Sequence, residues 1–398
     1  MPVHPARSWA PSLPSALLLM VPFDVLASLA MDVYLPVLAQ MPAALGTSSA
    51  LVQLTLSGYL LVLGMGQLIF GPLSDRIGRR PVLLGGALLF TSASFALAAT
   101  QGGGLFLALR MLQALGASAA LVATFATVRD VYADTRQGNT IYSLFGSILA
   151  FVPALGPILG TLIALSFGWR AIFVMLGVTG LIAMVHAWRG WHETRPAPTP
   201  RRRAVLGAVL ADAPFRVYTL GFSAAMGSFF VFFSIAPRLL IGVVGLSQLM
   251  FSLAFASVAL VMIVVTRFAG RFVACWGVAG CCARGALVMM SGAVLLAICT
   301  WLLPSSLVTL LVPMWVIAIG IVMTVSVTAN GALAGFADNA GAAVALYYCI
   351  QGVLVAGLGT FWVLFLGGDS AWPLVAQALV VPAACLLGLV RLRRDGLQ

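Results

Sequence analysis

The sequence contains no lysine and is poor in residues that usually carry chemistry: of its 398 residues, 10 are acidic and three are histidine. Charged residues make up 8% of the chain, compared with about 25% in soluble domains. Without lysine no GxxxxGK[ST] loop can form, which excludes ATP-driven pumping by this chain. No GxSxG motif occurs either, so nothing indicates a serine hydrolase.

Metal and redox chemistry are also poorly supported. The six cysteines form no CxxC pair and have no histidine near them in the sequence. The segment WHET, from Trp191, lacks the second histidine of the zinc-protease motif, and no cluster of catalytic groups is visible at one membrane face. We therefore expect no metal, no cofactor and no catalytic residue, and the chain is not expected to be an enzyme.

Apolar residues, in contrast, make up 62% of the sequence and occur in long runs. A run of roughly 20 residues is the length that crosses a bilayer as a helix, and the short alternating segments of a membrane barrel are absent. These features predict an all-α membrane protein with twelve transmembrane helices. The predicted spans are 14–36, 51–72, 81–100, 104–128, 138–166, 169–189, 214–237, 247–267, 280–302, 306–330, 341–366 and 371–391.

The arginines predict the orientation of these helices. If the N-terminus is cytoplasmic, 18 of the 21 arginines fall in cytoplasmic segments, two (Arg170 and Arg238) fall outside, and Arg110 lies within a span. The positive-inside rule therefore predicts that both termini are cytoplasmic. The net charge of +11 then reflects topology and contact with lipid headgroups, so nucleic-acid binding is not expected.

The longest polar stretch, RGWHETRPAPTPRRRAVLGA, predicts a cytoplasmic linker at 191–213 between two six-helix halves, 1–190 and 214–398. Each half has a basic turn after its second span, GPLSDRIGRRP in the first and TRFAGRFVACWG in the second. This weak repeat suits a two-half transporter, although topology alone also places arginines there. The first apolar run resembles a secretory signal, but Asp24 interrupts it, so we interpret it as an uncleaved helix.

Two acidic residues, Asp24 and Asp32, lie in the first predicted span. Asp24 is roughly 15 Å deep at about 1.5 Å per residue, where an ionised carboxylate costs at least ~2.5 kcal/mol. Asp24 is therefore a candidate proton or substrate site, and a structural ion pair is the alternative. Arg110 lies at a depth similar to that of Asp32, which predicts an Asp32–Arg110 pair that either fixes helix packing or modulates protonation.

The segment from Gly71 to Pro81 joins the second and third spans. Gly71 and Pro72 are expected to end one helix, and Gly78 to permit a tight turn. The segment resembles the GxxxDRxGRR signature of the major facilitator superfamily. The match is complete at Gly71, Asp75, Arg76, Gly78, Arg79 and Arg80. The resemblance implies a gating role in switching between inward-open and outward-open states, not a substrate site.

The fifth span contains Pro153, Gly156, Pro157 and Gly160. The two glycines form a GxxxG face that permits close helix approach, and the prolines permit bending. On physical grounds alone this is a packing feature. It also resembles the GPxxG antiporter motif of drug exporters in the superfamily, and that resemblance implies export.

Aromatic side chains are candidates for an apolar binding surface. Phe229 and Phe233 lie in an aromatic stretch of the seventh span, where they either line a drug pocket or only pack. Phe23, Tyr34 and Tyr59 lie in sequence or predicted depth close to the acids of the first span. We retain all five as candidate substrate-binding residues, together with Asp24 and Asp32.

A closer resemblance covers nearly the whole chain. The segments LPSALLLMVPFDVLASLAMDVYLPVLAQMP, LVATFATVRDVYA, LAFVPALGPILG and RGWHETRP resemble the chloramphenicol/florfenicol exporters, a phenicol branch of the drug:H⁺ antiporters with Bcr/CflA-like relatives. The resemblance implies a monomer in the bacterial inner membrane that exchanges a small amphiphilic drug for protons, with the proton gradient as its energy source. The alternatives are a broader multidrug exporter and a proton-coupled metabolite importer on the same fold.

Overall fold

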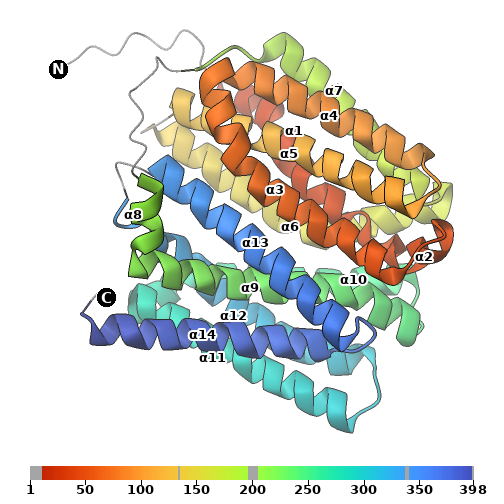
Figure 1. The fold of residues 1–398 in the computed structure, drawn as a ribbon, viewed down its shortest axis with the longest axis vertical. Helices are drawn as coiled ribbons and strands as arrows, with labels where there is room; N and C mark the ends of the chain where they lie inside the picture. Colours follow the sequence, from red (N-terminus) through yellow and green to blue (C-terminus); the bar gives the residue numbers. More distant parts are fainter. Residues whose placement is uncertain (1–10, 133–134, 196–204, 337–339, 397–398) are drawn as a thin grey trace.

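The computed structural model describes residues 11–132, 135–195, 205–336 and 340–396, and these ranges form a bundle of helices without strands (Figure 1). The predicted all-α fold with twelve long helices is confirmed. They are α1 (Leu13–Asp32), α3 (Ser49–Ile77), α4 (Arg79–Ala99), α5 (Gly103–Tyr132), α6 (Arg136–Phe167), α7 (Arg170–Gly190), α9 (Ala213–Pro237), α10 (Gln248–Thr266), α11 (Ala269–Leu302), α12 (Leu307–Leu333), α13 (Ala340–Leu366) and α14 (Trp372–Arg394). Among the described residues, 11 spans are long and apolar enough to cross a membrane, and α6 adds the shorter stretch Phe151–Phe167. The chain is therefore a multi-pass membrane protein.

Polar residues mark the starts of several helices. The side chains of Ser48, Thr135, Asp212, Ser247 and Ser306 each accept a hydrogen bond from a backbone N–H in the first turn of the following helix. Those N–H groups have no partner within the helix itself, so a capping oxygen stabilises the helix start. Local sequence thus fixes where these helices begin.

The helix α3 does not end where the sequence predicts. Gly71 and Pro72 lie inside α3, which continues to Ile77, so the prediction that they end the helix is wrong. A proline is tolerated inside a membrane helix because neighbouring helices and local adjustments re-satisfy the freed backbone groups. The predicted turn at Gly78 is confirmed: its φ of 111° is a conformation that favours glycine.

Two other helix boundaries also differ from the prediction. The helix α1 stops at Asp32 rather than near Pro36, and the chain continues as the 3₁₀ helix η1 (Leu35–Gln40) and the short α2 (Met41–Ala44). A proline restricts the residue before it and cannot donate to an α-helical hydrogen bond, which favours the change at this point. The helix α11 begins at Ala269 instead of 280, and a break at Gly277 separates a short first segment, 269–276, from the rest.

The long helices form two groups that meet along two seams. α1 and α3–α7 contact mainly one another, as do α9–α14, and the seams are α3 against α13 and α6 against α10. Figure 1 shows α13 running beside α3. Gly64 of α3 and Gly352 of α13 permit this approach, because a Cβ added at Gly64 would lie 3.3 Å from the Cα of Gly352.

The two ends of the bundle differ. We call the end that holds the Gly78 turn the motif end; the described chain starts here, where the Tyr132 hydroxyl donates to the carbonyl of Pro11. A second apolar core, which includes Phe215 and Leu389, lies at the motif end of α9–α14. Within the described residues, the hydrogen bonds that join the two groups lie toward the opposite end. They are Gln53 to Ser234 (3.0 Å), Thr161 with Ser252 (2.8 Å) and with the carbonyl of Gln248 (3.3 Å), and Ser252 to the carbonyl of Pro157 (3.0 Å).

Candidate functional site: the buried charges of α1 and α5

Arg110 of α5 is fully buried among backbone and aromatic rings. Its Nη1 donates to the carbonyl oxygen of Ala30 in α1 (3.1 Å) and to Oε1 of Gln113 (2.6 Å). The guanidinium carbon lies 4.5 Å from the ring centre of Tyr59 and 5.2 Å from that of Tyr34. Its Nε and Nη2 donate to no atom of the described residues. A buried cation with unpaired donors is costly, so this site favours an incoming anion or acceptor.

Gln113 fixes the guanidinium from the next turn of α5. While its Oε1 accepts from Arg110, its Nε2 donates to the hydroxyl of Ser94 on α4 (2.8 Å), which donates in turn to the carbonyl of Phe90 (2.7 Å). All three polar side chains are buried. This series of hydrogen bonds was not predicted from the sequence, although Gln113 and Arg110 are three residues apart and share a helix face.

The predicted ion pair between Asp32 and Arg110 is wrong for this structure. No ion pair joins them in the described residues, although Arg110 binds the carbonyl of Ala30, two residues before Asp32. Asp32 is the last residue of α1, and its Cβ faces α6. Tyr59 lies within electrostatic range of both groups, but the two groups do not contact each other directly.

The glycines of α6 explain where Asp32 lies. A Cβ added at Gly156 would lie 2.6 Å from the Cβ of Asp32, and one at Gly160 would overlap the carbonyl of Val33. The close approach predicted for this GxxxG face is therefore present, and the partner is the end of α1. The carbonyl of Pro157 accepts from Ser252 of α10 at 3.0 Å, so the same segment also contacts the other group of helices.

Asp24 lies two turns before Asp32 on α1 and is 4% exposed. Its carboxyl group lies within electrostatic range of Tyr348 of α13, so it is near the other group of helices. Within the described residues it forms no ion pair. Asp24 is therefore a buried acid close to the seam between the groups, without the cationic partner that a purely structural role would require.

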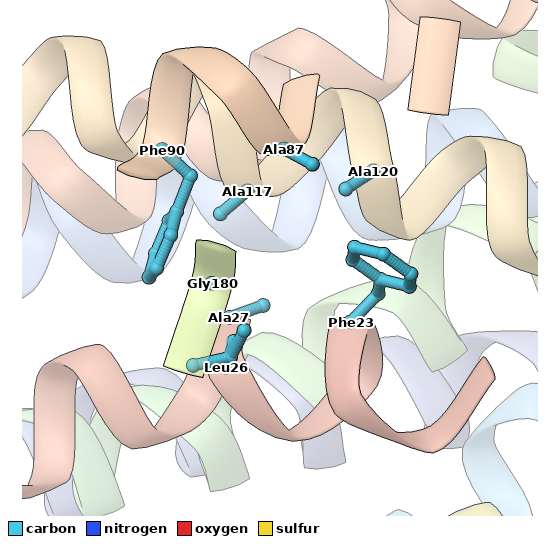
Figure 2. A pocket seen from close by; sticks show the side chains of 8 residues that line it. All are labelled: Phe23, Leu26, Ala27, Ala87, Phe90, Ala117, Ala120 and Gly180. Atoms are coloured by element: carbon cyan, nitrogen blue, oxygen red, sulfur yellow. The ribbon is translucent and has the colours of Figure 1, made fainter. Parts of the chain in front are cut away.

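Phe23 lies inside the first group of helices and not between the two groups. Figure 2 shows its ring beside a small cavity inside the first group, lined by residues of α1, α4, α5 and α7. The ring also meets that of Trp191 edge-on at 6.1 Å. This position favours packing within the first group over contact with a substrate between the groups.

Tyr34 and Tyr59 support Arg110. Tyr34 is fully buried and packs against the rings of Phe106 and Phe173, at 5.9 and 5.7 Å. The Tyr59 hydroxyl donates to the carbonyl of Ala27 in α1 (2.9 Å). Cation–π contacts to these rings stabilise the buried guanidinium.

Phe229 and Phe233 lie on α9, in the second group of helices. Both contact the ring of Phe255 on α10, at 6.0 and 5.9 Å. Phe233 is buried and Phe229 half-buried. The candidate substrate-binding residues therefore lie in three places: around the buried charges of α1 and α5, in the interior of the first group, and in an aromatic cluster of the second group.

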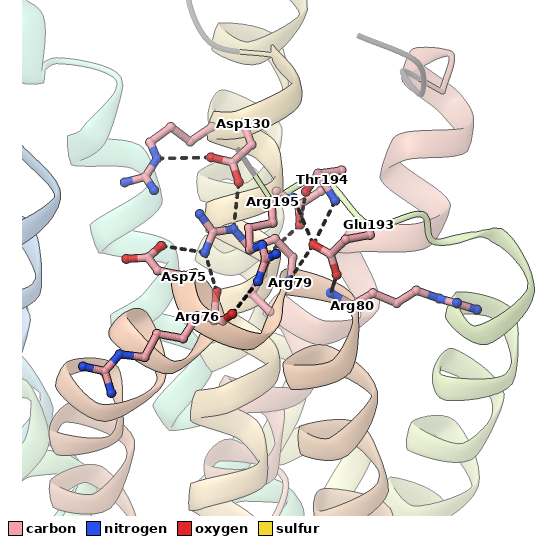
Figure 3. A network of polar contacts seen from close by, with 12 residues as sticks. Asp75, Arg76, Arg79, Arg80, Asp130, Glu193, Thr194 and Arg195 are labelled. Atoms are coloured by element: carbon pink, nitrogen blue, oxygen red, sulfur yellow. Dashed lines mark hydrogen bonds and ion pairs between the residues drawn. The ribbon is translucent and has the colours of Figure 1, made fainter. Parts of the chain in front are cut away.

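The signature segment Gly71 to Pro81, which we call the motif turn, is built around Arg79, which is 1% exposed. Its Nη1 donates to Asp75 (2.6 Å) and to the hydroxyl of Ser74 (2.8 Å), and its Nε donates to Asp130 of α5 (2.7 Å) (Figure 3). One guanidinium thus joins the ends of α3, α4 and α5. Asp130 was not among the predicted residues, although it directly follows Arg129 in the segment TVRDVY.

Glu193, in the segment WHET, completes this network. Its carboxylate accepts from the backbone N–H groups of Arg79 (2.8 Å) and Arg80 (3.2 Å), the first residues of α4, and from those of Thr194 and Arg195 (Figure 3). A Cβ added at Gly78 would overlap this carboxylate. Glu193 therefore caps α4 and attaches the segment after α7 to the motif turn, a role that the sequence did not reveal.

The fold and these buried charges define a membrane transporter with two groups of helices. The chain belongs to the Major Facilitator Superfamily, whose family description it matches over residues 24–389. The chain is 50% identical over 383 residues to a chloramphenicol resistance protein of Pseudomonas aeruginosa, with 96% of this chain and 91% of that protein covered. It is 29% identical over 346 residues to multidrug resistance protein D of Escherichia coli, with 85% of each chain covered.

Solved structures agree on the fold. A peptide transporter POT in complex with sulfate superimposes with a TM-score of 0.75 at 15% identity, covering 96% of this chain and 94% of the other. A D-xylose-proton symporter superimposes with a TM-score of 0.71 at 16% identity, covering 94% and 97%. At these identities the likeness shows the fold alone.

Proposed function

We propose that the chain is a proton-coupled exporter of phenicol antibiotics that gives resistance to chloramphenicol and florfenicol. The observation that carries this proposal is the 50% identity over nearly its full length to a chloramphenicol resistance protein. Phenicols are small uncharged amphiphiles, which need apolar walls and a few polar groups for binding.

The buried charges support proton coupling. In the proposed cycle, a proton from outside neutralises a carboxylate of α1 and weakens its hold on the drug. Release of the proton to the cytoplasm restores the charge and resets the site. We treat Asp24 and Asp32 as a coupled pair, because neither alone need carry the proton.

The positions of the candidate substrate-binding residues indicate which of them we propose to contact the drug. Asp24 and Phe229 are better placed to contact the drug than the other candidates. Asp24 is near Tyr348 of the second group, and Phe229 is half-buried. Tyr34 and Tyr59 act through Arg110, since their rings surround its guanidinium.

We further propose that the protein is a monomer in the bacterial inner membrane with the motif end in the cytoplasm, as the arginine distribution supports. Residues 1–190 and 214–398 then form the two moving halves, and 191–213 forms the linker. Hydrogen bonds between the groups lie toward the opposite end, which supports a state closed to the outside.

Expression in a pump-deficient bacterium tests this function. We expect raised resistance to chloramphenicol and florfenicol, and drug-dependent proton movement in everted vesicles. Asp24→Asn and Asp32→Asn should reduce that proton movement, whereas Asp395→Asn is a matched control because Asp395 is exposed and forms no ion pair within the described residues. No gain in resistance despite membrane expression would refute the phenicol assignment. Full proton-coupled efflux in both Asn variants would refute the proton site but not the family.

A broader multidrug exporter is the second candidate, favoured by the similarity to multidrug resistance protein D of Escherichia coli. The same strains distinguish the two: resistance that extends to cationic dyes as well as phenicols would support the broader specificity.

A further inference from the structure

Three exposed arginines lie in residues 267–284, which join α10 to the membrane span of α11 and which we call the α10–α11 turn: Arg267, Arg271 and Arg284. It lies at the motif end, since Phe272 and Val273 of this turn pack against the apolar core of that end. The break at Gly277 separates the segment 269–276 from the membrane span of α11. This segment is thus a separate short helix at the motif end of the bundle.

The corresponding turn of the first group, between α3 and α4, neutralises its arginines with acids of the same chain: Asp75, Asp130 and Glu193 contact Arg79, its backbone or its neighbours. Within the part of the chain that the structure describes, the α10–α11 turn has no such acidic partners. The sequence contains no acidic residue between Asp212 and Asp338, and in the described ranges the three arginines form no ion pair.

Aromatic rings take the place of the acids. The guanidinium of Arg284 lies 4.8 Å from the ring centre of Trp276, which stacks on Phe272 at 5.4 Å with an interplanar angle of 9°. Arg271 lies 5.7 Å from the ring centre of Phe268. Trp276 and Phe268 are 37% and 42% exposed. Exposed tryptophan beside arginine is typical of the level of lipid headgroups.

We propose that this turn binds the phosphate headgroup of an anionic phospholipid, held by Arg267, Arg271 and Arg284 with Trp276 and Phe268 at the glycerol and upper acyl level. The lipid supplies the counter-charge that acidic residues supply at the α3–α4 turn. Arginine presents a planar set of donors that matches a phosphate group, and the stacked rings hold Arg284 in a fixed orientation.

The test compares the full-length protein in nanodiscs of phosphatidylglycerol and of phosphatidylcholine, with native mass spectrometry to count retained lipids and thermal unfolding to measure stability. We expect retention of phosphatidylglycerol and a higher Tm in that lipid. Each arginine contributes roughly fivefold to binding of an anionic surface, so Arg271→Gln with Arg284→Gln should weaken retention by roughly 25-fold. Lysine at both positions should keep most of the effect, and this second variant guards against misfolding.

The control is Arg393→Gln with Arg394→Gln, which removes two exposed arginines from α14 at the same end. The proposal is overturned if this control loses the lipid equally, because the attraction is then diffuse. It is also overturned if phosphatidylglycerol is retained equally by the wild type and the Arg271/Arg284 glutamine variant. Inorganic phosphate added in phosphatidylcholine is expected to leave Tm unchanged; an equal stabilisation would identify a free anion as the ligand instead.

Discussion

Replacing Gly160 by alanine is expected to push α6 away from α1, because the new methyl group overlaps the carbonyl of Val33 and lies 2.8 Å from its carbon atom. Both are backbone atoms, so no side chain can rotate to make room. Overpacking of this kind costs roughly 1–3 kcal/mol. Gly156→Ala meets the Cβ of Asp32 at 2.6 Å and should cost somewhat less.

The matched control is Gly357→Ala. Gly357 also lies inside a helix, α13, but a Cβ there has no heavy atom within 4 Å. Alanine should be neutral or stabilise this helix by up to ~1 kcal/mol, since it has the higher helix propensity.

The measurements are thermal unfolding in detergent and drug efflux in vesicles. We expect Gly160→Ala to lower Tm by several degrees, at roughly 2 °C or more per kcal/mol, and to reduce efflux because Asp32 and Val33 adjoin the shifted contact. If Gly160→Ala and Gly357→Ala unfold at the same temperature, α1 and α6 are not in the tight contact described here, and the explanation of the GxxxG face fails.

Three further variants test other parts of the structure. Glu193→Ala removes the acceptor of four backbone N–H groups and should lower the free energy of unfolding by ~1–3 kcal/mol, with faster hydrogen exchange at Arg79 and Arg80. Glu193→Gln should retain part of this protection, and unchanged exchange in both variants would contradict the capping role. Arg79→Lys cannot bind Asp75, Ser74 and Asp130 together and should abolish efflux, while the exposed Arg76→Lys should retain it; full efflux in Arg79→Lys would show that one charge suffices at this turn. Gln113→Leu removes the acceptor of Arg110 and should change the pH profile of efflux without loss of membrane expression, and an unchanged profile would show that Gln113 only packs.

Much of the fold was predictable from single residues and their spacing. The lengths of the apolar runs are set by the bilayer, so twelve helices were predicted, and the structure contains them. Gly78 was predictable as a turn because its positive φ favours glycine. The end of α3 was not, because the effect of Pro72 on a helix depends on the neighbours that hold it in place.

The candidate site was also predictable only in part. The sequence by itself determined that the membrane-spanning part contains two carboxylates and one deep arginine. Charged residues are rare in apolar runs because placing them in a bilayer costs free energy, so each one can be recognised in the sequence. Spacing along a helix also gave their approximate depth. It did not give the rotation of each helix or the identity of its neighbour, and a hydrogen bond depends on both.

Only the tertiary structure therefore decided the partners. It places Arg110 on a backbone carbonyl of α1, on Gln113 and beside two tyrosine rings, and it places Asp32 against the glycines of α6. It also brings Glu193 to the start of α4, over 100 residues away in the chain. Depth is a property of one helix, whereas pairing is a property of two, and the packing of the whole bundle sets it.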